Sequence, residues 1–262
     1  MEKQHTFVIC AYQESEYLEE CIRSLMRQTV KSEILMATST PNPYIKKVSE
    51  KYAIPLYVNT GERGMTQDWN FAYRQAKTPL VTIAHQDDVY AKNYTELVLE
   101  YLKKSRDPLL LFTDYGELRD GVTVLKNHLL QIKRAMLQPL RIPMFWNSIF
   151  VRRRILSLGD PICCPAVTFC RERLPEEIFT PGFRSDEDWE AWERLSRMKG
   201  AFVFIPSVGM LHRIHQDSET SAILGDHARN EEDYQMFRKF WPRPIARFLA
   251  NLYSKSEQSN NL

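Results

Sequence analysis

The sequence predicts an α/β protein with a mainly parallel sheet flanked by helices, and three observations support this fold class. Short apolar runs alternate with amphipathic segments of helical length through the first 115 of the 262 residues. The segments between successive runs are long enough to form right-handed crossover helices. Hydrophobic residues make up 44% of the chain and charged residues 26%, a balance typical of a protein that buries a sizeable core.

The first half contains the clearest alternation of strands and helices. Strands are expected at 6–10, 34–37, 55–58, 80–84 and 109–113, and helices at 14–28, 43–52, 66–76 and 93–103. In 14–28, for example, Leu18, Ile22 and Leu25 recur at helical spacing. Because parallel sheets bind ligands beyond the carboxyl ends of their strands, the residues after Cys10 and Ala84 are expected to line a site.

The second half is less regular. Helices are expected at 129–137, 186–198, 226–241 and 243–254, and short strands at 166–170, 201–205 and 208–212. The sequence contains no phosphate-binding Walker A loop, no GxGxxG, no HExxH and no GxSxG motif. The chemistry must therefore be sought in other residues.

Composition and charge exclude several classes of protein. The net charge is only +2, so no nucleic-acid partner is expected. The five cysteines show no CxxC spacing, which indicates reduced thiols and a cytoplasmic location. The segment 1–6 is polar, so no signal peptide is expected, and no apolar run approaches the roughly 20 residues of a membrane span.

The strongest local feature is the carboxylate pair Asp87 and Asp88, directly after the apolar run 80–84. Two carboxylates at the carboxyl end of a strand suit a hard divalent cation, which prefers oxygen ligands. Such a cation can bridge a diphosphate and neutralise the charge of a nucleotide leaving group. The alternative is that the pair only caps a helix or forms a turn.

The order of several segments resembles that of the family 2 glycosyltransferases of the GT-A fold. These segments are TFVIC, AYQESEYLEECIRSLMRQT, EILMA, NTGERGMTQDWNFAYRQAKTPLVTIAHQDDVY, SDEDWEAWERLSRMKG and LHRIHQDSETS. The resemblance covers about residues 6 to 221. It implies a GT-A-like sheet and an inverting, metal-dependent transfer of a sugar from a nucleoside diphosphate sugar to an acceptor hydroxyl.

The resemblance also implies roles for individual residues. The nucleotide-sugar site would include Ala11, Tyr12, Glu14, Thr38, Asp68, Trp69, Asn70, His85, Gln86, Asp87 and Arg213. Asp87, Asp88 and His215 would bind Mg²⁺ or Mn²⁺. Glu187 and Asp188 match the family's ED motif, in which the aspartate is the general base.

Two positions depart from the family pattern. His85 stands where the first aspartate of the DxD motif is expected, so one carboxylate is missing. The second strand ends in Ala37-Thr38-Ser39-Thr40 instead of acidic residues, so Thr38 would contact the base through its hydroxyl or its backbone. These departures leave open which nucleotide is bound and how tightly the metal is held.

Several of these residues also have a structural interpretation. Ser185 would be a good N-cap, and acids at 186–188 would then stabilise the start of a helix. His215 could be a satisfied surface residue, and Tyr12 and Trp69 could pack instead of stacking on a base. For the cysteines at 163 and 164, packing is the favoured interpretation.

The resemblance divides the chain into 1–225, a GT-A domain, and 226–262, an amphipathic helical extension. Residues 1–115 would bind the donor, with a UDP-sugar favoured, and 116–225 a glycan or lipid-linked acceptor, in the assembly of bacterial surface polysaccharide or glycolipid. The alternatives are a degenerate nucleotide-sugar-binding protein and a sugar nucleotidyltransferase. The second needs a Gly-rich basic loop, whereas AYQESEY is acidic. The sequence leaves the oligomeric state open.

The C-terminal extension combines aromatic and basic residues. Between 236 and 255 there are five basic residues and no acid, and 121–159 also lacks acids. Such a segment can lie on the inner face of the cell membrane, and the region around Met144 could join the same face. The alternative is an amphipathic helix packed on the domain or on a dimer partner.

Overall fold

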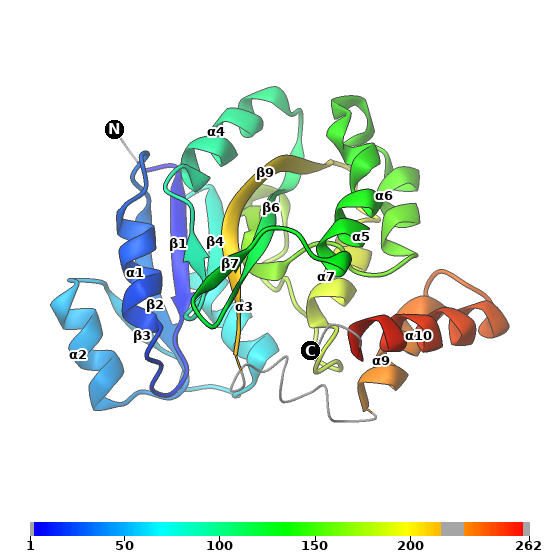
Figure 1. Cartoon of the computed structure of the whole chain (residues 1–262). Helices are drawn as coiled ribbons and strands as arrows, with labels where there is room; N and C mark the ends of the chain where they lie inside the picture. The colour runs from blue at the N-terminus through cyan, green and yellow to red at the C-terminus, as the bar shows by residue number, and fades with distance from the viewer. Residues whose placement is uncertain (1–2, 216–227, 259–262) are drawn as a thin grey trace.

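A mixed sheet organises the protein, for which a computed structural model describes residues 3–215 and 228–258. In these residues nine strands join in the order β3-β2-β1-β4-β8-β6-β9-β5, and β7 pairs with β6 (Figure 1). The strands are β1 (His5–Cys10), β2 (Glu33–Thr38), β3 (Leu56–Val58), β4 (Leu80–His85), β5 (Val89–Tyr90), β6 (Pro108–Arg119), β7 (Val122–Val124), β8 (Val167–Cys170) and β9 (Ala201–Ile214).

Helices cover the sheet and connect its strands. The α-helices are α1 (Leu18–Met26), α2 (Pro43–Lys51), α3 (Met65–Gln75), α4 (Tyr94–Lys104), α5 (His128–Met136), α6 (Ile149–Leu156), α7 (Glu187–Leu195), α9 (Ala228–Arg238) and α10 (Arg243–Gln258). Short 3-10 turns are η1 (Gln138–Arg141), η2 (Pro143–Phe145), η3 (Cys164–Ala166) and η4 (Arg171–Arg173). Among the helices of the described ranges, none combines the length and the apolar character needed to cross a membrane.

The first half forms the parallel part of the sheet, as the alternating pattern predicts. Strands β3, β2, β1 and β4 run parallel to one another. In register, Cys10 of β1 lies opposite Ala37 of β2 on one side and His85 of β4 on the other. The carboxyl ends of three strands therefore meet at one edge, where the site is expected.

The second half completes the sheet with antiparallel and parallel pairs. Strand β8 runs antiparallel between β4 and β6, while β6 and β9 are parallel over most of their length. The expected strands at 201–205 and 208–212 are in fact one strand, because β9 bulges near Pro206 yet continues to pair with β6. Gly209 permits this close approach, since an added Cβ would lie 2.5 Å from the Thr113 hydroxyl.

The structure corrects some expected boundaries. Helix α1 begins at Leu18 rather than at 14, because the chain first makes a turn in which Gln13 has φ +54°. Helices α7 and α9 are shorter than expected, and residues 226–227 lie outside the described ranges. Helix α6 and the short strands β5 and β7 were not predicted. Their runs of two to eight residues carry little periodicity.

The C-terminal helices pack on the same core as the sheet. Phe237 of α9 and Ala246 and Ala250 of α10 are fully buried within it. Trp189 of α7 contacts the rings of Phe237 and Tyr253, with ring centroids 5.0 and 5.7 Å apart. Residues 228–254 are thus joined to the helix that carries the expected general base.

His5 predicts how stability depends on pH. Its ring nitrogens lie 2.9 Å from the Ser32 hydroxyl and 3.0 Å from the Thr82 hydroxyl. Burial lowers the pKa of His5 from 6.5 to about 3, so the folded protein keeps it neutral where the unfolded chain takes up a proton. The stability that the folded protein gains from a neutral His5 is therefore fully present above the unfolded pKa of 6.5 and is lost as the pH falls toward 3. At about pH 5 we expect a loss of about 2 kcal/mol in the free energy of unfolding.

Urea unfolding of the wild type, His5→Asn and His128→Asn near neutral pH and at about pH 5 tests this expectation. His128 is exposed at the start of α5 and serves as the matched control. The difference in stability between the two pH values should shrink in His5→Asn and stay unchanged in His128→Asn. An unchanged difference in His5→Asn would show that another group causes the loss.

Candidate active site

The aligned ends of β1, β2 and β4 form the floor of the site. Gln86 joins the loop after β4 to the loop after β1. The Gln86 amide accepts a hydrogen bond from the Tyr12 N–H at 2.9 Å and donates one to the Tyr12 carbonyl at 3.0 Å. The Ala11 N–H donates to the Ala37 carbonyl at 2.8 Å. The Tyr12 ring remains 48% exposed, so it stands free to contact a ligand.

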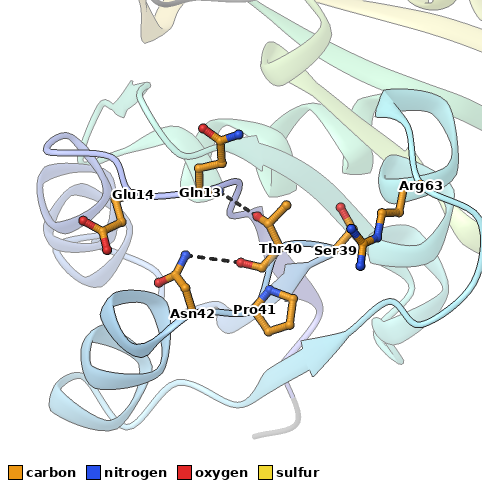
Figure 2. Close-up of a pocket in the computed structure, with 7 residues that line it drawn as sticks. All are labelled: Gln13, Glu14, Ser39, Thr40, Pro41, Asn42 and Arg63. Atoms are coloured by element: carbon orange, nitrogen blue, oxygen red, sulfur yellow. Dashed lines mark hydrogen bonds between the residues drawn. The ribbon is translucent and has the colours of Figure 1, made fainter.

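A polar pocket of about 410 Å³ opens beside this loop, between the ends of β1 and β2 (Figure 2). Gln13, Glu14, Ser39, Thr40, Pro41, Asn42 and Arg63 line it. The Gln13 N–H donates to the Thr40 hydroxyl at 2.7 Å, and the Thr40 N–H donates to the Thr38 hydroxyl at 3.0 Å. Thr38 is 3% exposed, so its side chain shapes the turn and is not open to the pocket.

Asp68, at the first turn of α3, supplies the carboxylate nearest to the end of β2. It accepts hydrogen bonds from the Ser39 hydroxyl at 2.5 Å and from the Asn59 amide at 2.8 Å. These bonds tie α3 to the loops after β2 and β3. Asp68 therefore places a negative charge behind Ser39, at a strand end that has hydroxyl groups instead of acids.

Asn70 was expected near the nucleotide, but the structure gives it an internal partner. Its side-chain oxygen accepts the N–H groups of Ile178 and Phe179 at 2.9 and 3.0 Å. Its side-chain nitrogen donates to the Phe179 carbonyl at 2.7 Å, and the residue is 5% exposed. These contacts support a role in holding the 178–179 segment against α3.

Four residues from two distant segments of the chain meet at the end of β4. Ligand atoms of His85, Asp87 and Asp88 lie within 4.8 Å of one another. His215, directly after β9, brings its Nε2 to 3.0 Å from the Asp87 carboxylate, across 128 positions of the chain. Strand β9 thus places an imidazole nitrogen beside the acidic pair that follows β4.

Asp88 is buried and holds β9 in place. Its Oδ1 accepts the Arg213 backbone N–H at 2.9 Å and lies 3.0 Å from Nδ1 of His212. Burial alone would lower the pKa of His212, but the Asp88 carboxylate raises it to about 9. This internal pairing indicates that Asp88 contributes through position and charge, whereas Asp87 is the more accessible carboxylate.

Arg213 is likewise largely committed to the protein. Its Nε donates to the Asp87 carbonyl at 2.7 Å, and its guanidinium contacts the Glu20 carboxylate at 2.6 Å. The same group lies over the Tyr17 ring, 4.2 Å from the centroid. At 6% exposure, Arg213 shapes the backbone of Asp87 and adds positive charge to the site without projecting into solvent.

The donor set fits a divalent cation. In the described part of the chain, Oδ2 of Asp88 and Nε2 of His85 are buried without a hydrogen-bond partner. Burial lowers the pKa of His85 to about 4, so its ring is neutral and retains a free lone pair. The ring also stacks on Trp69, with centroids 5.2 Å apart and planes 16° apart. Carboxylates combined with imidazoles suit Mn²⁺. Mg²⁺ prefers oxygen ligands, so it would be bound mainly by the carboxylates.

Asp188 lies in the first turn of α7, and its Oδ1 accepts the Trp189 N–H at 2.8 Å. The expected Ser185 cap is wrong, because α7 begins after Asp186 and the Ser185 hydroxyl donates instead to Glu232 at 2.7 Å. The acids of this turn are therefore not explained by a Ser185 cap. Glu187, at 4% exposure, faces the interior, whereas Asp188 is half-buried.

The structure also brings together residues that the sequence did not indicate. Asp160 shares a hydrogen bond with Asp188, and burial together with the Asp188 charge raises the pKa of Asp160 well above its ordinary value. The Lys133 ammonium opposes this shift and also lies beside Tyr115, 5.7 Å from the ring centroid. Both groups come from segments without a motif, so only the folded chain reveals them.

Cys163 lies within electrostatic reach of both the Asp160–Asp188 pair and Asp88 of the expected cation site. Burial raises the pKa of the Cys163 thiol well above its ordinary value, and the charges of Asp88, Asp160 and Asp188 raise it further. The expected cation site and the expected base thus share one region of the molecule.

The chain resembles known proteins both in sequence and in structure. A sequence model of the family described as Glycosyl transferase family 2 matches residues 6–169. No curated protein sequence matches the chain significantly.

Two groups of solved structures share the fold. The Staphylococcus aureus TarS fragment 1–349 in complex with UDP-GlcNAc has a TM-score of 0.62 at 14% identity, covering 94% of this chain and 70% of that one. The Pyrobaculum calidifontis mannosyltransferase PcManGT with GDP-Man and Mn²⁺ has a TM-score of 0.60 at 14% identity, covering 100% and 77%. The match to the longer TarS structure covers only 41% of that chain. These likenesses confirm the expected α/β, GT-A-like fold.

Proposed function

This chain belongs to glycosyltransferase family 2, and from that membership we propose that it moves a sugar from a nucleoside diphosphate sugar to an acceptor hydroxyl. The observation that carries the proposal is the pairing of Asp87 with His215 at the sheet edge, 3.0 Å apart. The pocket lies beside the end of β1, which pairs with the end of β4 that precedes Asp87. The charges of both Asp88 and Asp188 act on the pKa of Cys163. The similar structures were solved with UDP-GlcNAc and with GDP-Man and Mn²⁺.

We propose that residues 1–115 form the donor half. The nucleoside would occupy the pocket beside Glu14 and Thr40, with Tyr12 available to stack on its base. Asp87 and His215, with His85 and Asp88 behind them, would hold Mg²⁺ or Mn²⁺. That cation, when bound, neutralises charge on the diphosphate.

Residues 116–225 would form the acceptor half, in which Asp188 acts as the general base. It takes the proton of the acceptor hydroxyl as that oxygen forms its bond to the anomeric carbon of the donor. The bond between the sugar and the nucleoside diphosphate breaks, and the diphosphate leaves with the electron pair. Attack opposite to the leaving group inverts the anomeric configuration. Asp160, which shares a hydrogen bond with Asp188, would help to fix the position of the base.

The acceptor that we propose is a glycan or a lipid-linked sugar, as in the assembly of bacterial surface polysaccharide or glycolipid at the cytoplasmic side of the membrane. A UDP-sugar is the favoured donor. Residues 226–262 would be an extension to this transferase unit.

Thermal unfolding with a panel of UDP-, GDP-, dTDP- and CMP-sugars, with and without Mn²⁺, tests the donor proposal. A ligand that binds only the folded state raises the melting temperature, and at 100 times its Kd it adds about 2.7 kcal/mol of stability. For a small-to-medium domain this corresponds to a rise of several degrees. We expect a rise with one nucleotide, enlarged by Mn²⁺. No rise with any of them, for a folded protein, would contradict the proposal.

One observation favours a second candidate, a binding protein without turnover. His85 is neutral where the family carries a carboxylate, so the cation site has one negative charge fewer than the pattern predicts. Such a protein would give the thermal shift but would neither transfer nor hydrolyse the donor. Release of nucleoside diphosphate, measured with the donor that gives the shift, separates the two candidates.

A further inference from the structure

Helices α6 and α10 carry large apolar side chains that are exposed to solvent. Phe150 of α6 is 72% exposed and Phe248 of α10 is 67% exposed. We define the α6/α10 face by these residues together with Arg154, Leu158, Ile245 and Leu252. Both helices lie at the end of the molecule farthest from α2 (Figure 1).

Direct contacts join the two helices into one surface. The indole N–H of Trp241, two residues before α10, donates to the Ser157 carbonyl at 2.7 Å. The guanidinium of Arg154 lies over the rings of both Trp241 and Phe150, at 5.1 and 5.7 Å from their centroids. Gly159 packs against the ring of Tyr253, where an added Cβ would lie 2.8 Å from the ring. Side-chain contacts therefore hold α6 and α10 next to each other.

Helix α10 has two apolar sides, and only one of them is used by the fold. Ala246, Ala250 and Tyr253 form the inner side, which packs on Trp189 and the core. Ile245, Phe248 and Leu252 follow the spacing i, i+3, i+7 and lie together on the outer side. A surface helix normally presents polar residues outward, so an outer apolar stripe indicates a binding surface.

The charge around this face favours an anionic partner. No acid occurs in 121–159 or in 236–255, whereas Arg154 and Arg243 are exposed. Arg247 is partly neutralised by Glu231, 3.4 Å away. Two copies of the chain would bring these basic groups against one another, which disfavours a dimer through this face. An anionic bilayer offers apolar depth for the phenylalanines and negative head groups for the arginines.

We propose that the α6/α10 face docks on an anionic phospholipid surface. Phe150, Phe248 and Leu252 enter the boundary between head groups and acyl chains, and Arg154 and Arg243 meet lipid phosphates. Helix α6 packs directly on α7, since the Trp189 indole donates to the Leu156 carbonyl at 3.1 Å and Arg153 pairs with Glu193 at 2.6 Å. The bilayer therefore lies beside the helix that carries Asp188. Docking itself does not depend on the proposed transferase activity.

Flotation of the full chain with lipid vesicles tests the docking. We expect binding to vesicles of phosphatidylcholine with roughly 30% phosphatidylglycerol and weak binding to pure phosphatidylcholine, because each basic residue near an anionic surface adds to the affinity. The double variant Phe248→Ser/Leu252→Ser should lower the partition coefficient at least about tenfold, since two large apolar groups no longer enter the lipid. Arg154→Gln/Arg243→Gln should lower it on anionic vesicles and flatten its dependence on salt.

Matched variants on other surfaces serve as controls. Val122→Ser/Leu125→Ser removes two exposed apolar side chains, 63% and 47% exposed, at the β6–β7 hairpin. Arg27→Gln/Arg106→Gln removes two exposed arginines elsewhere. These controls should bind vesicles like the wild type, and thermal unfolding should show that all variants are folded.

Several outcomes would overturn the proposal. Recovery of the wild type in the lipid-free fraction with both vesicle types would do so, as would equal losses in the matched controls. A dimer in light scattering that Phe248→Ser/Leu252→Ser dissociates, without vesicle binding by the wild type, would assign the face to a second copy of the chain. If the wild type fails to float with vesicles but still binds the donor, the docking proposal is wrong while the proposed function stands.

Discussion

Replacement of Asp188 by asparagine is expected to lower kcat about 10²–10⁴-fold, the range that a positioned general base contributes. Asparagine keeps the size of the side chain and can still accept the hydrogen bond from the Trp189 N–H, which Asp188 accepts at 2.8 Å. It cannot take the proton of the acceptor hydroxyl. The thermal shift produced by the donor should therefore persist while turnover is lost.

The measurement is initial-rate kinetics with the donor identified by thermal unfolding, followed as release of nucleoside diphosphate. Asp120→Asn is the matched control, because Asp120 is exposed in the β6–β7 turn at φ +47°, a conformation that asparagine adopts readily. The control should retain wild-type kcat. If Asp188→Asn also retains it, another group must be the base, and the neighbouring carboxyl of Asp160 becomes the next residue to replace.

Replacement of Asp87 by asparagine is expected to remove most of the metal-dependent part of donor binding and to lower kcat/KM by about 10²–10³-fold. The reason is that a bound divalent cation contributes several kcal/mol of charge stabilisation to such reactions. Asp87 provides the more accessible carboxylate of the pair, and its partner His215 lies 3.0 Å away. Asparagine is a much weaker ligand because it has no negative charge.

Thermal unfolding in a series of Mn²⁺ concentrations at fixed donor measures this effect separately from turnover. The wild type should show a Mn²⁺-dependent rise that Asp87→Asn lacks. Asp107→Asn is the control, because Asp107 is an exposed aspartate that pairs only with Arg173 at the surface among the described contacts. An undiminished Mn²⁺ effect in Asp87→Asn would mean that the cation binds elsewhere.

The sequence predicted the elements of residues 1–115 well because the signals there are local. Each strand from β1 to β4 is a short apolar run followed by a periodic helix, and the carboxyl ends align as the parallel arrangement requires. The position of Asp87 and Asp88 after β4 follows from the run Leu80–Ala84 alone. The departures at His85 and Thr38 were also evident, because they stand at fixed positions in the family pattern.

The remaining features depend on contacts between distant segments. The continuity of β9 across Pro206 follows from pairing with β6, which no local propensity expresses. The neighbours of Asp188, which are Asp160 and Lys133, come from segments without motif or periodicity. The internal partners of Asn70 lie more than 100 positions along the chain, so the resemblance to the family, which placed Asn70 near the nucleotide, did not indicate them.

The contact between Asp87 and His215 has a consequence for synthesis on the ribosome. The acidic pair after β4 is made early, yet the His215 partner of Asp87 follows 128 residues later, and Arg213, whose backbone binds buried Asp88, follows that residue by 125 positions. A nascent chain can therefore form β1 to β4 and their helices while the proposed cation site stays incomplete. The proposed cation site is complete only when β9 has emerged and paired with β6, so a chain released before that point would lack it.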